Sequence, residues 1–117
     1  MEISGSKDYF ETLDNLVNNS KVIIDRKKGS AHPRYPEMVY KVDYGYVEDK
    51  SSEDGNEINV YRGSLPKQEV IGILCTFDLV KKDSEVKILL GLSDDEIDLV
   101  CKTHSKPGYM SCILIKR

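Results

Sequence analysis

Strand-like segments dominate this sequence, and helical patterns occur only near its two ends. Between residues 21 and 92, short apolar segments are separated by turns rich in Gly, Pro and charged residues, which is typical of successive strands. Because strands and helices do not alternate, the pattern disfavours a parallel α/β sheet and predicts an α+β domain that is mainly β. We expect strands at 21–26, 38–47, 58–62, 69–80, 86–92 and 109–115.

Two amphipathic helices are expected, at residues 7–18 and 93–104. The second begins with Ser93 and has Glu96 three residues later, the pattern of a capping box. Gly72, inside an apolar β-branched segment, predicts a bulge or bend. Five or six strands with an N-terminal and a C-terminal helix packed outside predict an antiparallel OB-like barrel, closed or partly open, that binds ligands on one face.

Length and composition favour one ordinary domain covering residues 1–117. Hydrophobic residues make up 39% and charged residues 32% of the chain, which argues against disorder. The longest apolar runs are far shorter than the roughly 20 residues of a membrane-spanning helix. The first ten residues lack a basic start followed by an apolar core, so no signal peptide is expected. These features predict a cytoplasmic protein without a membrane partner. Cys75, Cys101 and Cys112 form no CxxC pair and are expected to be reduced core residues.

One basic patch stands out in a chain whose net charge is −3. This balance fits a small anionic ligand better than a long nucleic acid. The patch contains a glycine turn at 28–34 with a hydroxyl and flanking cations, a plausible phosphate cradle. A solvated strand end and turn explains the same pattern. The basic residues are Lys21, Arg26, Lys27, Lys28, His32 and Arg34.

Oxygen-bearing and aromatic side chains form two further candidate groups. Residues 53–59 place Asp54, Asn56 and Asn59 around a glycine, a composition that suits a hard cation such as Mg²⁺ or Ca²⁺. A solvated acidic loop is the alternative, because EF-hand spacing is absent. Tyr40 and Tyr44 share one strand face, where their hydroxyls would hydrogen-bond a phosphate or simply pack. His104 is expected to be a packed or capping residue.

These segments, in this order and approximate spacing, resemble the soluble inorganic pyrophosphatases over residues 21–92. The corresponding stretches are IIDRKKGS, VYKVDYGYV, EDGNEINVY and SEVKILLGL. Three motifs, GSAHP, DGNEIN and LSDDEI, are similar to those of a short bacterial subgroup of the family. The resemblance implies an OB-type barrel, Mg²⁺ as cofactor, frequent oligomerisation and hydrolysis of pyrophosphate to two phosphates.

The resemblance also implies roles for individual residues. Asp54 and Asn59 fall on catalytic positions of the acidic motif. The positions that bind substrate phosphate fall on Lys28, Arg34, Tyr40, Tyr44 and Lys87. The positions that bind metal fall on Asp25, Asp54, Asn56, Asn59 and Glu85.

The sequence departs from the family at the metal positions, because Asn56 and Asn59 stand where the family has aspartates. Two divalent cations about 4 Å apart repel by roughly 16 kcal/mol at an effective dielectric constant of about 20. With fewer carboxylates to offset that repulsion, we expect an Mg²⁺-dependent pyrophosphatase of reduced activity. The alternative is a non-catalytic homologue that binds phosphate, a nucleotide or a protein partner. An oligonucleotide-binding barrel is a third hypothesis, disfavoured by the acidic segment and the net negative charge.

Overall fold

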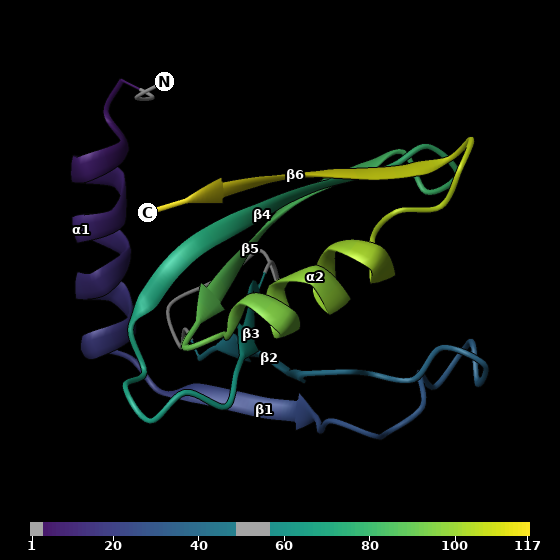
Figure 1. Cartoon of the computed structure of the whole chain (residues 1–117), viewed down its shortest axis with the longest axis horizontal. Helices are drawn as coiled ribbons and strands as arrows, with labels where there is room; N and C mark the ends of the chain where they lie inside the picture. The colour runs from purple at the N-terminus through teal and green to yellow at the C-terminus, as the bar shows by residue number, and fades with distance from the viewer. Residues whose placement is uncertain (1–3, 49–56) are drawn as a thin grey trace.

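A computed structural model describes residues 4–48 and 57–117 of the chain. In these residues two helices accompany one six-stranded sheet, so the fold is α+β and mainly β (Figure 1). Neither helix is long and apolar enough to cross a membrane. In chain order the elements are α1 (Ser6–Asn18), β1 (Val22–Arg26), β2 (Asp43–Val47), β3 (Ile58–Arg62), β4 (Val70–Asp78), β5 (Asp83–Leu90), α2 (Asp94–Thr103) and β6 (Met110–Lys116).

The sheet consists of two antiparallel halves that meet at one parallel pair. Strands β1, β2 and β3 form the first half, and β5, β4 and β6 form the second, in the order β1-β2-β3-β5-β4-β6. The expectation of an antiparallel arrangement is wrong at the join, where β3 runs parallel to β5. The reason is that β5 turns back along β4 on the side facing β3, so its other edge pairs with β3. No pairing joins β1 to β6 within the described part of the chain, so the sheet is open there.

Local sequence signals match most element ends. Residues 58–62 form a strand with the predicted bounds, and the register shifts beside Gly72 as a bulge would require. Ser93 and Glu96 form the predicted capping box at the start of α2. The second predicted strand is too long, because residues 38–42 make only a single bridge, between Val39 and Ala31, before β2 begins.

Gly45 permits the close approach of β1 to β2. A Cβ atom at this position would lie 1.8 Å from the backbone oxygen of Ile23, which no side chain tolerates. Close packing therefore explains the glycine of the Tyr-Gly-Tyr stretch, where Gly45 pairs with Ile24 of the edge strand β1.

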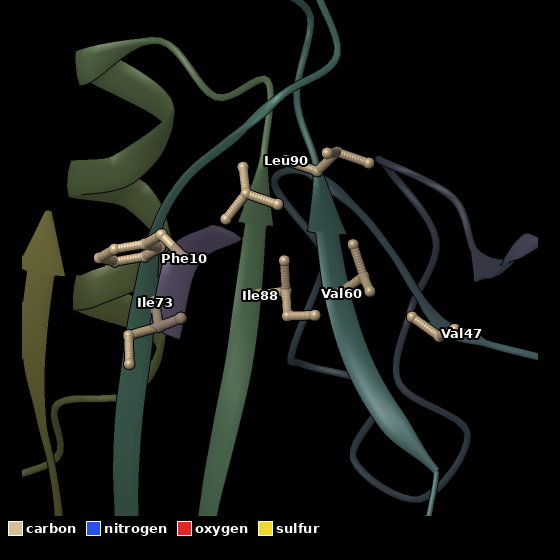
Figure 2. Close-up of a cluster of buried hydrophobic side chains, with 7 residues drawn as sticks. Phe10, Val47, Val60, Ile73, Ile88 and Leu90 are labelled. Atoms are coloured by element: carbon tan, nitrogen blue, oxygen red, sulfur yellow. The ribbon is translucent and has the colours of Figure 1, made fainter. Parts of the chain in front are cut away.

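One face of the sheet packs against α1 and is apolar. Phe10 of α1 lies beside Ile73 of β4, and Val60 and Ile88 fill the adjoining rows (Figure 2). Leu13, Leu16 and Val17 of α1 complete the contact at helical spacing. We call this side the α1 face.

The opposite face packs against α2, which lies on the inner, concave side of the curved sheet (Figure 1). Ile97 and Val100 of α2 contact Leu74, Leu89 and other apolar side chains there. We call this side the α2 face. Helix α2 covers only part of it, and the uncovered part forms the site described next.

Candidate functional site

A wide cavity of about 1210 Å³ opens on the α2 face. Its walls come from β1, β2, β3 and β5, from the β4–β5 hairpin and from the end of α2. Alternation along the strands places every second residue on this face, so Asn59 and Tyr61 of β3 face it together with Glu85 and Lys87 of β5. We call this site the Lys87 cavity.

Lys87 is the central cation of the cavity and is only 4% exposed. A buried ammonium group needs hydrogen-bonding partners to offset its lost hydration. Lys87 Nζ donates to Tyr44 Oη at 2.8 Å and to Glu85 Oε2 at 2.6 Å. It also lies 5.0 Å from the centroid of the Tyr44 ring. These contacts fix the charge in one position at the boundary between core and cavity.

Glu85 is the carboxylate that accompanies this cation. Burial alone would raise the pKa of Glu85, but the hydrogen bond and charge of Lys87 outweigh it, so the pKa lies below its usual value. Asn59 Nδ2 donates to the same Oε2 atom at 3.4 Å, a weaker contact. Glu85 is therefore ionised at neutral pH, with Lys87 and Asn59 both on one of its oxygens.

A row of aromatic side chains in contact crosses the cavity, from Tyr40 just before β2 to the end of α2. Tyr40 stacks on Tyr44 with ring centroids 5.4 Å apart, and Tyr44 contacts Tyr61 at 4.7 Å. Burial raises the pKa of Tyr44 and of Tyr61 well above the usual phenol value. Both hydroxyls therefore keep their protons at physiological pH and are available as hydrogen-bond donors.

His104 ends this row and is held neutral. Its Nε2 atom lies 2.7 Å from Tyr61 Oη. Burial, followed by the positive charge of Lys87, lowers the pKa of His104 to about 4. His104 is also the C-cap residue of α2, which confirms the expectation of a packed or capping role.

Most predicted site residues that the structure describes meet at this cavity, and two do not. Those that line it are Asp25, Tyr40, Tyr44, Asn59, Glu85 and Lys87. Lys28 and Arg34 are exposed and are not among the lining residues. Instead the backbone N–H of Lys28 donates to Asp43 Oδ1, and that of Arg34 donates to His32 Nδ1. Asp54 and Asn56 lie outside the described residues.

Sequence reasoning missed Tyr61 as a site residue and treated His104 only as a packing residue. The signal for Tyr61 was present, because it lies two residues after Asn59 on the same strand and therefore on the same face. No sequence signal connects Tyr61 to His104, which is 43 positions away. Their contact follows from how α2 packs across the sheet.

The charges around the cavity are balanced. Its described lining residues include six Lys or Arg side chains and six Asp or Glu side chains. A surface of this kind offers both cations for phosphate oxygens and carboxylates for a metal.

The oxygen ligands surround the cavity without forming a preformed cage. Among residues 4–48 and 57–117, no group of three His, Cys, Asp or Glu side chains converges in a metal-binding arrangement. Glu85 already pairs with Lys87. This donor set fits a hydrated Mg²⁺ ion held by one or two carboxylates together with substrate phosphates, which is the usual way proteins hold this metal.

No protein-family model, no curated protein and no solved structure matches the chain. The resemblance to pyrophosphatases therefore stays a prediction.

Proposed function

We propose that the Lys87 cavity binds pyrophosphate or a related small phosphate ligand as its Mg²⁺ complex. The observation that carries the proposal is the buried Lys87 ammonium, held by Tyr44 and Glu85 at the edge of a wide cavity. An ammonium has three N–H donors, and two are used by these partners. Tyr44 accepts from Lys87, so its own O–H remains as a donor. A phosphate oxygen arriving here would accept from both groups.

The neighbouring carboxylates explain why the ligand would carry Mg²⁺. Glu85 and Asp25 line the same cavity as Lys87 and would repel an uncomplexed phosphate. A divalent cation held by these carboxylates would offset that repulsion. When bound, Mg²⁺ would neutralise the phosphates and polarise their oxygens. Asp25 and Glu85 would supply carboxylate ligands to it, and Asn59 an amide oxygen.

Hydrolysis of pyrophosphate to two phosphates is the catalytic form of this proposal. Lys87 and Tyr44 would orient one phosphate, and their hydrogen bonds would stabilise the negative charge that develops on the departing group. Asp54 is the remaining candidate carboxylate of the metal site. The proposal includes the OB-like barrel of the family, and the curved, open sheet would be one form of it. It also includes a cytoplasmic setting and self-association.

Binding without turnover is the second candidate function. The observation that favours it is the pairing of Glu85 with Lys87, which leaves this carboxylate partly neutralised before any metal arrives. In addition, the amide of Asn59 brings no negative charge to the site. A phosphate ligand would then be held but not hydrolysed.

Calorimetric titration with pyrophosphate, in the presence and absence of Mg²⁺, tests the binding step. We expect saturable binding that needs Mg²⁺, is weakened at least about tenfold in Lys87→Met, and is unchanged in Lys67→Met. Lys67 is the matched control because its side chain is 83% exposed and is not among the residues lining the cavity. Absence of binding, or equal weakening in both variants, would overturn the proposal.

Phosphate release in the presence of Mg²⁺ separates the two candidate functions. Turnover that Asp54→Asn abolishes would establish an enzyme. If the natural protein binds pyrophosphate without releasing phosphate, while the double variant Asn56→Asp/Asn59→Asp releases it, the site is a binding site with a reduced metal shell.

A further inference from the structure

A second candidate site lies where α2 meets β6, and it is built from two cysteines. Cys101 is on the last turns of α2, and Cys112 is on β6; both side chains are half-buried in the core of the α2 face. The Cys112 thiol donates to the backbone carbonyl of Cys101 at 3.7 Å. Ser105 Oγ donates to the same carbonyl at 2.8 Å and lies 3.7 Å from Cys112 Sγ.

The third cysteine lies on the other side of the sheet. Cys75 of β4 packs with the apolar residues of the α1 face. In the β4–β6 register it pairs with Ile113, whereas Cys112 pairs with Thr76. Since neighbouring residues of a strand point to opposite faces, the sheet separates Cys75 from Cys112. The fold therefore places together one pair of cysteines out of three.

We propose that Cys101 and Cys112 form a dithiol–disulfide site that exchanges with small-molecule disulfides such as oxidised glutathione. In the first step, one cysteine thiolate attacks the small disulfide, forms a mixed disulfide and releases one thiolate. In the second step, the other cysteine thiolate attacks the protein-side sulfur and releases the second thiolate. The two cysteines lose two protons and two electrons, and the small disulfide is reduced to two thiols.

The surroundings determine the rate and the consequence of this exchange. Burial, and then the proximity of Cys112, raise the pKa of the Cys101 thiol, so the reaction accelerates as the pH rises and more thiolate forms. Lys102, Thr103 and His104 follow Cys101 directly and line the Lys87 cavity. A bond from Cys101 to Cys112 would tie this end of α2 to β6 and hold that wall of the cavity in place.

The test is incubation of the reduced, folded protein with oxidised glutathione at mildly alkaline pH, followed by alkylation and peptide mapping. We expect a cross-link between Cys101 and Cys112, loss of two hydrogens from the intact mass, and an alkylatable thiol at Cys75. The same treatment in guanidinium should give all three pairings, because the unfolded chain does not hold one pair together. This readout does not depend on phosphate binding, so it stands or falls separately from the proposed function.

Single serine variants provide the matched controls. Cys75→Ser should cross-link at the rate of the natural protein, whereas Cys101→Ser and Cys112→Ser should stop at stable mixed disulfides. Accumulation of mixed disulfides without a cross-link in the natural folded protein would overturn the proposal. So would a folded-state cross-link that involves Cys75. Both outcomes are visible in the natural chain, even where a variant fails to fold.

Discussion

Each face of the sheet contains a side chain of β5 that is almost fully buried, but the two side chains are held by different kinds of contact. Ile88 and Lys87 are neighbours on β5, and both are almost fully buried, at 0% and 4% exposure. Ile88 packs in the apolar cluster of the α1 face, whereas Lys87 is held on the α2 face by hydrogen bonds to Tyr44 and Glu85. Burial alone therefore does not identify a core residue, because the groups that a buried side chain contacts determine its role.

The unequal helices account for the difference. Helix α1 presents a continuous apolar stripe to its face, from Phe10 to Val17. Helix α2 is shorter and ends at Thr103, so the part of its face beyond that point is left to polar groups. A polar group in such a place needs a partner, and no buried side-chain N or O atom of the described residues lacks one. The α2 face therefore combines a core with a ligand site.

Truncating Ile88, the apolar one of these two neighbours on β5, should have the largest effect on stability. We expect Ile88→Ala to lower the free energy of unfolding by about 3 kcal/mol, because it leaves a cavity in close-packed surroundings. Val86→Ala is the control on the same strand and face, where the side chain is 43% exposed, and should cost less than about 1 kcal/mol. Urea denaturation measures both. Equal losses would mean that the α1 face is not packed as described.

The next largest effect concerns the pH dependence of His104 on the α2 face. Its folded pKa of about 4 lies below the ordinary value of 6.5, so the unfolded chain takes up the proton first as the pH falls. Stability from this residue is complete above the ordinary value and is lost as the pH falls toward 4. Between about pH 7 and pH 5 the loss should be about 2 kcal/mol.

Unfolding of the natural protein and of His104→Gln at several pH values measures this contribution. The advantage of the natural protein over the variant should shrink as the pH falls over that range. His32→Gln is the comparison variant: the pKa of His32 is also lowered, but its side chain is only half-buried, so this variant should change the pH dependence less. A constant difference between His104→Gln and the natural protein would show that His104 is not held neutral.

Removing Glu85 and removing Lys87 should lower the free energy of unfolding by different amounts. Glu85→Gln leaves a buried ammonium with one charged partner fewer, so we expect a loss of about 2 kcal/mol in unfolding free energy. Lys87→Met removes the buried charge and leaves Glu85, whose side chain is 39% exposed and can be hydrated, so the loss should be about 1 kcal/mol. Chemical denaturation compares them, and the reverse order would contradict the account of Lys87 as the buried member.

The smallest expected effect compares two ion pairs made by the last residues of the chain. Arg117 makes two hydrogen bonds to Asp14 of α1, at 2.8 and 2.6 Å, while Lys116 approaches Asp94 of α2 at 3.8 Å with both side chains exposed. Asp14→Asn should cost about 0.5 kcal/mol because its pair is bidentate and partly buried. Asp94→Asn should change the unfolding free energy by less than that. Thermal melts in low and high salt test this difference, because salt should reduce the cost of Asp14→Asn. A cost that does not change with salt would contradict the prediction.

Sequence periodicity predicted those parts of the molecule that depend on neighbours along the chain. The bounds of β3, the bulge at Gly72 and the capping box at Ser93 all follow from local patterns. The meeting of Asn59, Glu85 and Lys87 was implied only by the family resemblance. In the structure it depends on the parallel pairing of β3 with β5, and sequence spacing contains no signal for that pairing.

Two candidate residues lie outside the lining of the Lys87 cavity. Lys28 and Arg34 lie in a stretch of turns between β1 and β2, where no periodic pattern fixes the direction of a side chain. Charge, composition and the family resemblance drew attention to them, but neither residue lines the Lys87 cavity. The sequence did not decide between a closed and a partly open sheet, because edge pairing depends on contacts between distant segments.

The parallel join of β3 and β5 has a consequence for how the molecule is put together. The first half is a meander of strands in chain order, whereas in the second half β6 returns after α2 to pair with β4, on the side away from β5. The join pairs residue 59 with residue 87. Asn59 is contributed by one half, and Glu85 and Lys87 by the other, so neither half contains the site by itself. Two fragments divided in the 63–69 connection would each carry one half of the sheet. If the proposed phosphate binding returned when the fragments were mixed, it would show that β3 and β5 had paired again.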